Sequence, residues 1–93
     1  SMENLNYKKT VYPNILAVED VGVIQKLLSL YFRKMNCPFS IAASGSETIE
    51  IVNDNNNQFD LILMDLGLPD ADGITLTETI RKIPKYQDIP IIA

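Results

Sequence analysis

The sequence contains no histidine and only one cysteine, Cys37, and these two shortages restrict its chemistry. Without an imidazole, the chain cannot supply a histidine general base, a Ser-His or Cys-His nucleophile pair, or a phosphohistidine of its own. A single thiol forms no disulfide within the chain and cannot by itself build a zinc site, so we interpret Cys37 as an ordinary thiol. Chemistry on this chain therefore falls to carboxylates, hydroxyls and lysines.

Basic residues and long apolar runs are also scarce. The chain has 8 Lys and Arg against 12 Asp and Glu, which gives a net charge of −4. A nucleic-acid interface needs a clustered basic patch, so we expect no direct contact with nucleic acid. No apolar run approaches the ~20 residues of a membrane span, so we expect no membrane contact by this domain and a cytoplasmic location. Anchoring of a parent protein to the inner membrane stays open at this point.

What the chain does have is a regular alternation of short apolar runs with stretches of helical spacing. Short apolar runs that stop at acids are typical of parallel strands buried on both faces. The pattern predicts strands at 15–18, 39–43, 61–64 and 89–93, and helices at 21–35, after the turn at 44–46, and at 73–82. This order predicts one α/β domain over 15–93, with a parallel sheet between helices, after a leader or linker at 1–14.

Local patterns indicate how the helices begin and what they bury. Ser44 followed by Glu47 has the spacing of a capping box, which predicts the start of the second helix. The polar run at 53–58 predicts an exposed loop that ends this helix. In the first helix, the apolar residues expected to pack recur at helical spacing: Ile24, Leu27, Leu28, Tyr31 and Phe32.

Three acidic residues directly follow two of the predicted strands. Glu19 and Asp20 come after 15–18, and Asp65 comes after 61–64. The carboxyl ends of parallel strands lie along one edge of a sheet, where ligands bind in open α/β sheets, so we expect these acids to meet. Clustered carboxylates repel one another and persist together only with a compensating cation. Oxygen ligands alone favour Mg²⁺ or Mn²⁺, and an aspartate beside a metal-bound phosphate can act as a nucleophile.

Each acid also has a simpler interpretation. An acid after a strand commonly caps the next helix, which fits Asp20. An acid before a loop rich in Gly and Pro commonly serves the turn, which fits Asp65. The recurrence of the pattern, an acid after a four-residue apolar run at two strand ends, favours the functional interpretation over both.

Two segments carry a resemblance to a known family. Residues 15–20 (ILAVED) and 61–73 (LILMDLGLPDADG) resemble the receiver domain of response regulators and hybrid sensor histidine kinases, the CheY-like superfamily. The resemblance extends over 14–93. It implies a flavodoxin-like, doubly wound parallel sheet in the order 2-1-3-4-5, and a function as the phosphoryl-accepting domain of a two-component phosphorelay.

The resemblance also implies roles for individual residues. They are Asp65 as phosphoacceptor, Asp20 and Asp65 as metal carboxylates, the Gly67 backbone carbonyl as a further metal ligand, Glu19 as a ligand through water, and Pro69 and Gly73 as loop-shaping residues. The implied cofactor is Mg²⁺ or Mn²⁺. The implied partner is a histidine kinase or a phosphotransfer domain that carries a phosphohistidine. The domain itself is then a phosphoacceptor, whereas a hybrid histidine kinase as its parent would be a phosphotransferase.

The family pattern extends beyond this chain. Family members have a fifth strand, a Ser or Thr after the fourth strand and a Lys after the fifth, and all of these would follow Ala93. We therefore expect a receiver domain that is truncated after its fourth strand. An exposed apolar edge strand pairs with other chains, so a homodimer by domain swap or edge-strand pairing is one expectation. The others are a segment supplied by another chain and a disordered end.

Three other functions are compatible with parts of the sequence. A calcium loop at 70–73 fails because its first ligand position would be Leu68 and its bidentate acid position Thr79. An aspartate-based, Mg-dependent phosphohydrolase often has a second acid where this chain has Gly67. A receiver-like module that binds partners without phosphorylation stays open. The polar leader and the amino-acid sequence of the loop at 67–73 favour a hybrid histidine kinase as the parent protein over a small response regulator.

Overall fold

The computed structural model describes residues 11–93, in which strands and helices alternate. The elements are β1 (Ile15–Val18), α2 (Gly22–Lys34), β2 (Phe39–Ala42), α3 (Gly45–Asn53), β3 (Leu61–Met64), α4 (Gly73–Arg81), the 3-10 helix η1 (Pro84–Tyr86) and β4 (Ile91–Ile92). Residues 1–10 of the expected leader lie outside the described part, so the boundary at residue 15 stays a prediction. None of the helices described within 11–93 has the length and apolar character to cross a membrane.

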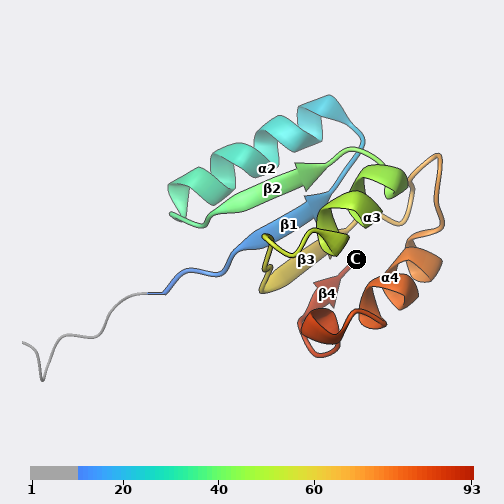
Figure 1. The fold of residues 1–93 in the computed structure, drawn as a ribbon. Helices are drawn as coiled ribbons and strands as arrows, with labels where there is room; N and C mark the ends of the chain where they lie inside the picture. Colours follow the sequence, from blue (N-terminus) through green and yellow to red (C-terminus); the bar gives the residue numbers. More distant parts are fainter. Residues whose placement is uncertain (1–10) are drawn as a thin grey trace, which may run out of the picture.

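The four strands form one parallel sheet in the order β2-β1-β3-β4 (Figure 1). β1 pairs in register with both neighbours, since Ile15 lies opposite Phe39 of β2 and opposite Leu61 of β3. β2 therefore lies on one side of β1, and β3 and β4 follow on the other side. This is the order that the resemblance predicts for the first four strands, and it sets the carboxyl ends of β1 and β3 side by side.

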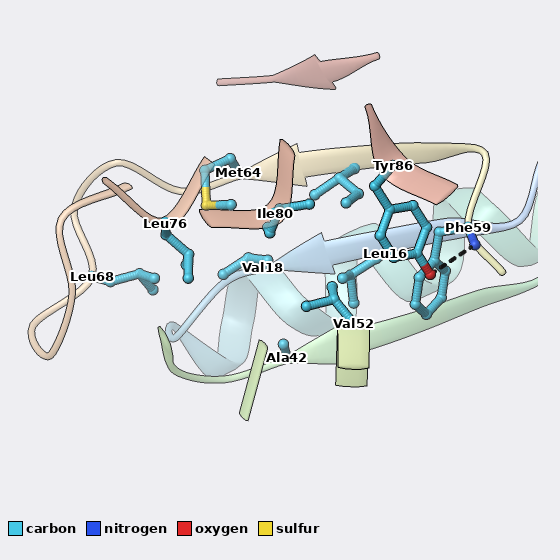
Figure 2. Packing of buried hydrophobic residues seen from close by; sticks show 11 residues of the cluster. Leu16, Val18, Ala42, Val52, Phe59, Met64, Leu68, Leu76, Ile80 and Tyr86 are labelled. Carbon is cyan, nitrogen blue, oxygen red and sulfur yellow. Dashed lines mark hydrogen bonds between the residues drawn. The ribbon is translucent and has the colours of Figure 1, made fainter. Parts of the chain in front are cut away.

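The larger core lies between the sheet and helices α3 and α4 (Figure 2). Its buried members come from strands, helices and connections: Leu16, Val18, Ala42, Val52, Phe59, Ile62, Met64, Leu68, Leu76, Ile80 and Tyr86. The Tyr86 ring stacks on Phe59, with centroids 6.3 Å apart. The Tyr86 hydroxyl accepts the Phe59 N–H at 3.4 Å and donates to the Asn57 carbonyl at 3.3 Å. Through these contacts η1 ties the connection after α4 to the segment that enters β3.

The polar run after α3 is held more firmly than an exposed loop requires. Residues 53–56 are exposed as the sequence predicts, but Asn57 is half-buried. Its carbonyl also accepts from the Lys85 ammonium at 2.6 Å, and its side-chain amide donates to the Ile51 carbonyl at 3.0 Å. Contacts between residues far apart in sequence, which periodicity cannot reveal, fix this end of the loop.

α2 covers the opposite face of the sheet and buries less than its spacing predicts (Figure 1). Phe32 is buried against Ile15 and other residues of the β1–β2 half of the sheet. The expectation that the whole apolar side packs is wrong, because Ile24, Leu27 and Tyr31 are 40%, 49% and 55% exposed. Within residues 11–93, no further helix lies beside α2 on this face to cover them.

Tyr86 provides a test of the tie between η1 and β3. Tyr86→Phe leaves the buried Phe59 N–H without its acceptor. We expect the free energy of unfolding to fall by about 1 kcal/mol, because both hydrogen bonds of the hydroxyl are long. Tyr86→Ala should cost about 3–5 kcal/mol, because it also leaves a cavity. Chemical denaturation measures both, and a Tyr86→Phe protein as stable as the wild type would show that the hydroxyl contributes nothing.

The exposed edge of the sheet provides a test of self-association. β4 is shorter than the strand predicted at 89–93, because it covers only Ile91–Ile92, and Ile92 is 52% exposed at the edge of the sheet. Within the described residues β4 pairs with β3 alone, and exposed apolar edges pair with other chains. Of the three expectations, edge pairing predicts that the chain sediments as a dimer and that Ile92→Lys sediments as a monomer. A monomeric wild type in analytical ultracentrifugation would contradict this expectation.

Candidate functional site

The ends of β1 and β3 bring three acids together. Glu19, Asp20 and Asp65 each offer one carboxylate oxygen, and these oxygens lie within 4.8 Å of one another. The strands leave the sheet at the same level, because Val18 pairs with Met64 and the Asp65 N–H donates to the Val18 carbonyl at 3.1 Å. The structure thus gathers the acids that the strand-end pattern predicts. The roles assigned to them stay predictions.

The protonation equilibria of these acids are shifted in opposite directions. The Gly67 N–H donates to Asp65 Oδ1 at 2.7 Å, and this hydrogen bond lowers the pKa of Asp65. Partial burial raises the pKa of Glu19, although the Val21 N–H donates to its carboxylate at 3.1 Å, and the neighbouring Asp65 raises this pKa further. Of these two acids, Asp65 therefore favours the ionised form more strongly.

The donor set fits a hard divalent cation. The three residues offer only carboxylate oxygens. Glu19, Asp65 and Gly67 also line an open hollow whose other lining residues are apolar. Three acids this close repel one another, and a cation offsets that repulsion. Mg²⁺ is typically held by one or two carboxylates with waters completing its shell, which this arrangement can supply.

The loop from β3 to α4 is shaped by close packing at its ends. A Cβ at Gly73 would lie 2.7 Å from Leu66 Cδ2 and 3.1 Å from the Asp65 carbonyl oxygen, so only glycine fits without a shift of the backbone. Asp72 caps the amino end of α4 with its side chain. Pro69 is exposed in the same loop. This packing gives the expected loop-shaping role of Gly73 a geometric basis, and the role of Pro69 stays a prediction.

Asp70 is a residue whose importance the sequence did not indicate. Its carboxylate accepts the N–H groups of Gly45 at 2.8 Å and of Ser46 at 3.2 Å, at the start of α3. These hydrogen bonds lower the pKa of Asp70. Ser44 caps the same helix by accepting the Glu47 N–H at 3.1 Å, as the capping-box spacing predicts. No local pattern could have revealed Asp70, because its partners precede it by 25 and 24 residues.

Comparison with known families decides the wider assignment. Residues 15–93 match the model of the response regulator receiver domain. The chain belongs to this family. Its sheet order and alternating helices are those of a CheY-like, flavodoxin-like receiver domain, and the family is that of two-component signalling.

Individual relatives include a response regulator and a histidine kinase. Response regulator mcs4 of Schizosaccharomyces pombe is 36% identical over 84% of this chain, which is 15% of the relative's length. The signal transduction histidine-protein kinase BarA of Escherichia coli K12 is 35% identical over 85% of this chain, which is 8% of that kinase. The chain thus spans only a small part of these proteins.

A solved structure shows the same fold with a cation. The receiver domain of a sensor histidine kinase from Pseudomonas aeruginosa PAO1 is 30% identical and has a TM-score of 0.77. The match covers 87% of this chain and 65% of that one. The relative was crystallised with a magnesium ion coordinated in its active site cleft.

The lowered pKa of Asp70 predicts a pH-dependent contribution to stability. The carboxylate is favoured in the folded chain, so its folded pKa lies below its unfolded pKa. Its contribution is then present above about pH 4 and is lost as the pH falls through the folded pKa. We expect Asp70→Asn to lower Tm at about pH 7 and to have a smaller effect at about pH 3.

The control for this measurement is Asp88→Asn, which removes the same charge from an exposed position before β4. Its effect on Tm should be small at both pH values. If the difference in Tm between wild type and Asp70→Asn is the same at both pH values, the carboxylate does not stabilise the fold through its charge.

Proposed function

We propose that this receiver domain accepts a phosphoryl group on Asp65 from a phosphohistidine of a histidine kinase or phosphotransfer domain. The observation that carries the proposal is the convergence of Glu19, Asp20 and Asp65 at the adjoining ends of β1 and β3. Membership of the receiver family supports the reaction type. The resemblance of the segment at 61–73 to the receiver domain supports the choice of Asp65 as the nucleophilic acid.

In the proposed step, a carboxylate oxygen of Asp65 forms a bond to phosphorus. The bond between phosphorus and the donor's imidazole nitrogen breaks, and its electron pair stays on that nitrogen. The product is an acyl phosphate on Asp65. The Gly67 N–H holds Asp65 Oδ1 at 2.7 Å and so fixes the plane of the carboxylate before the donor arrives. Such positioning accounts for much of the catalysis of phosphoryl transfer.

The same residues are proposed to hold Mg²⁺ or Mn²⁺. Asp20 and Asp65 provide carboxylates, the Gly67 carbonyl provides a further oxygen, and Glu19 acts through a water. When bound, the cation neutralises charge on the transferring phosphoryl group. The all-oxygen donor set supports this assignment, as does the magnesium ion in the Pseudomonas aeruginosa relative.

The parent protein is proposed to be a hybrid histidine kinase with this domain in the cytoplasm. The glycine- and aspartate-containing loop at 67–73 supports it, and a histidine kinase is among the relatives. A response regulator is also among them, so a smaller parent is the second candidate. The phosphohydrolase alternative loses its support, because the match to the receiver family extends over 15–93.

Phosphorylation tests the assignment of Asp65. With a small phosphodonor such as acetyl phosphate and Mg²⁺, we expect the wild type to gain one phosphoryl group by intact mass and Asp65→Ala to gain none. Asp20→Asn should form the adduct and require about tenfold more Mg²⁺, because a metal carboxylate has become an amide. Asp88→Asn, exposed and outside the cluster, should behave as the wild type.

Two results would contradict the proposal. An adduct of equal yield on Asp65→Ala would place the phosphoryl group on another residue. A wild type that gains no phosphoryl group, either from acetyl phosphate or from a phosphorylated histidine kinase, would refute the phosphoacceptor function itself.

A further inference from the structure

We propose that Asp70 is a positioning residue, which clamps the β3–α4 loop to the start of α3 and thereby holds the Gly67 segment in place for cation binding. The inference rests on the proposed function, because it concerns the same cation site. It concerns a different residue, which lies outside the acid cluster and is not proposed to contact the cation or the phosphoryl group.

The clamp is a carboxylate shared by two backbone donors. The first turn of a helix leaves its N–H groups without partners inside the helix. In α3, Asp70 accepts those of Gly45 and Ser46, and Ser44 accepts that of Glu47. All three N–H groups are thus satisfied by protein atoms, and two of them are satisfied by a single side chain from a distant loop. Loss of Asp70 would free the loop from the helix while the Ser44 cap remains.

Close packing also joins the β3–α4 loop to α3. A Cβ at Gly45 would lie 2.4 Å from Ala71 Cβ and 3.3 Å from Asp70 Oδ1. Gly45 is buried, so such a side chain has no open space to move into. A glycine at this position therefore lets the loop lie directly on the helix. A larger residue at position 45 would push the loop away even with Asp70 intact.

The clamp lies three residues beyond Gly67, on the far side of an apolar anchor. The Gly67 N–H is bound to Asp65, and Leu68 is buried in the core at 8% exposure. Asp70 then fixes the next turn of the chain to α3. A ligand group must be held to a fraction of an ångström, and residues behind the ligands commonly set metal affinity for this reason. Without Asp70, the Gly67 segment keeps its inner anchors and loses the outer one.

A matched pair of variants separates positioning from helix capping. Asp70→Ala and Ser44→Ala each remove a cap from the amino end of α3, so both should lower Tm. Of the two residues, only Asp70 belongs to the β3–α4 loop, so only Asp70→Ala should raise the Kd for Mg²⁺, by about tenfold in calorimetric titration with MgCl₂. Asp70→Asn retains one acceptor oxygen and should give an intermediate Kd. Gly45→Ala should raise the Kd with Asp70 present.

Each outcome supports or overturns the proposal. Equal Kd values for Asp70→Ala and the wild type, with faster amide exchange at Gly45 and Ser46, would show that Asp70 is only a helix cap. An equal rise in Kd for Ser44→Ala would show the same. If Asp70→Ala does not fold, an unchanged Kd for Mg²⁺ in both Asp70→Asn and Gly45→Ala overturns the proposal. A wild type that binds no Mg²⁺ refutes the proposed metal site as well, whereas binding unaffected by Asp70 refutes this inference alone.

Discussion

The in-register pairing of β1 with β3 is the constraint on which the rest of the site depends. Val18 lies opposite Met64, so the residues after the two strands leave the sheet at one level. β1 suits a position inside the sheet because all four of its residues are apolar, and all four are buried there. A slip of one residue would reverse the faces of its side chains and separate Asp20 from Asp65. The apolar strand core and the polar cluster are thus two consequences of one register.

Two of the acids accept backbone N–H groups from opposite sides of the cluster, one from the residue before α2 and one from the loop before α4. The Val21 N–H contacts the Glu19 carboxylate, and the Gln25 side chain donates to the Glu19 carbonyl at 2.6 Å, so α2 fixes this side. Asp65 is held from the other side, by Gly67 in the loop that leads to α4. The distances between the acids therefore depend on how α2 and the loop before α4 sit on the same sheet.

The sequence predicted the parts of this molecule that depend on local pattern. A few neighbouring residues encode the apolar runs of the strands, the apolar spacing of the helices and the Ser44 cap. The acids that follow two of the apolar runs predicted the acidic cluster at Asp65. The resemblance supplied the strand order. The clamp by Asp70 and the contacts of Tyr86 could not be predicted, because each joins segments more than twenty residues apart. The exposure of Leu27 was missed because periodicity shows which side of a helix is apolar and does not show what covers that side.

The two faces of the sheet differ in how firmly they hold the site, and the difference bears on function. α3, α4 and η1 enclose the larger core, and the Asp70 clamp joins α3 to the loop that carries Gly67. On the other face α2 buries Phe32 and leaves Ile24 exposed. The Asp65 side of the cluster is therefore built on the better-packed layer. Asp65, the proposed nucleophile, needs fixed geometry more than Glu19, the proposed ligand through water, which lies at the side attached to α2.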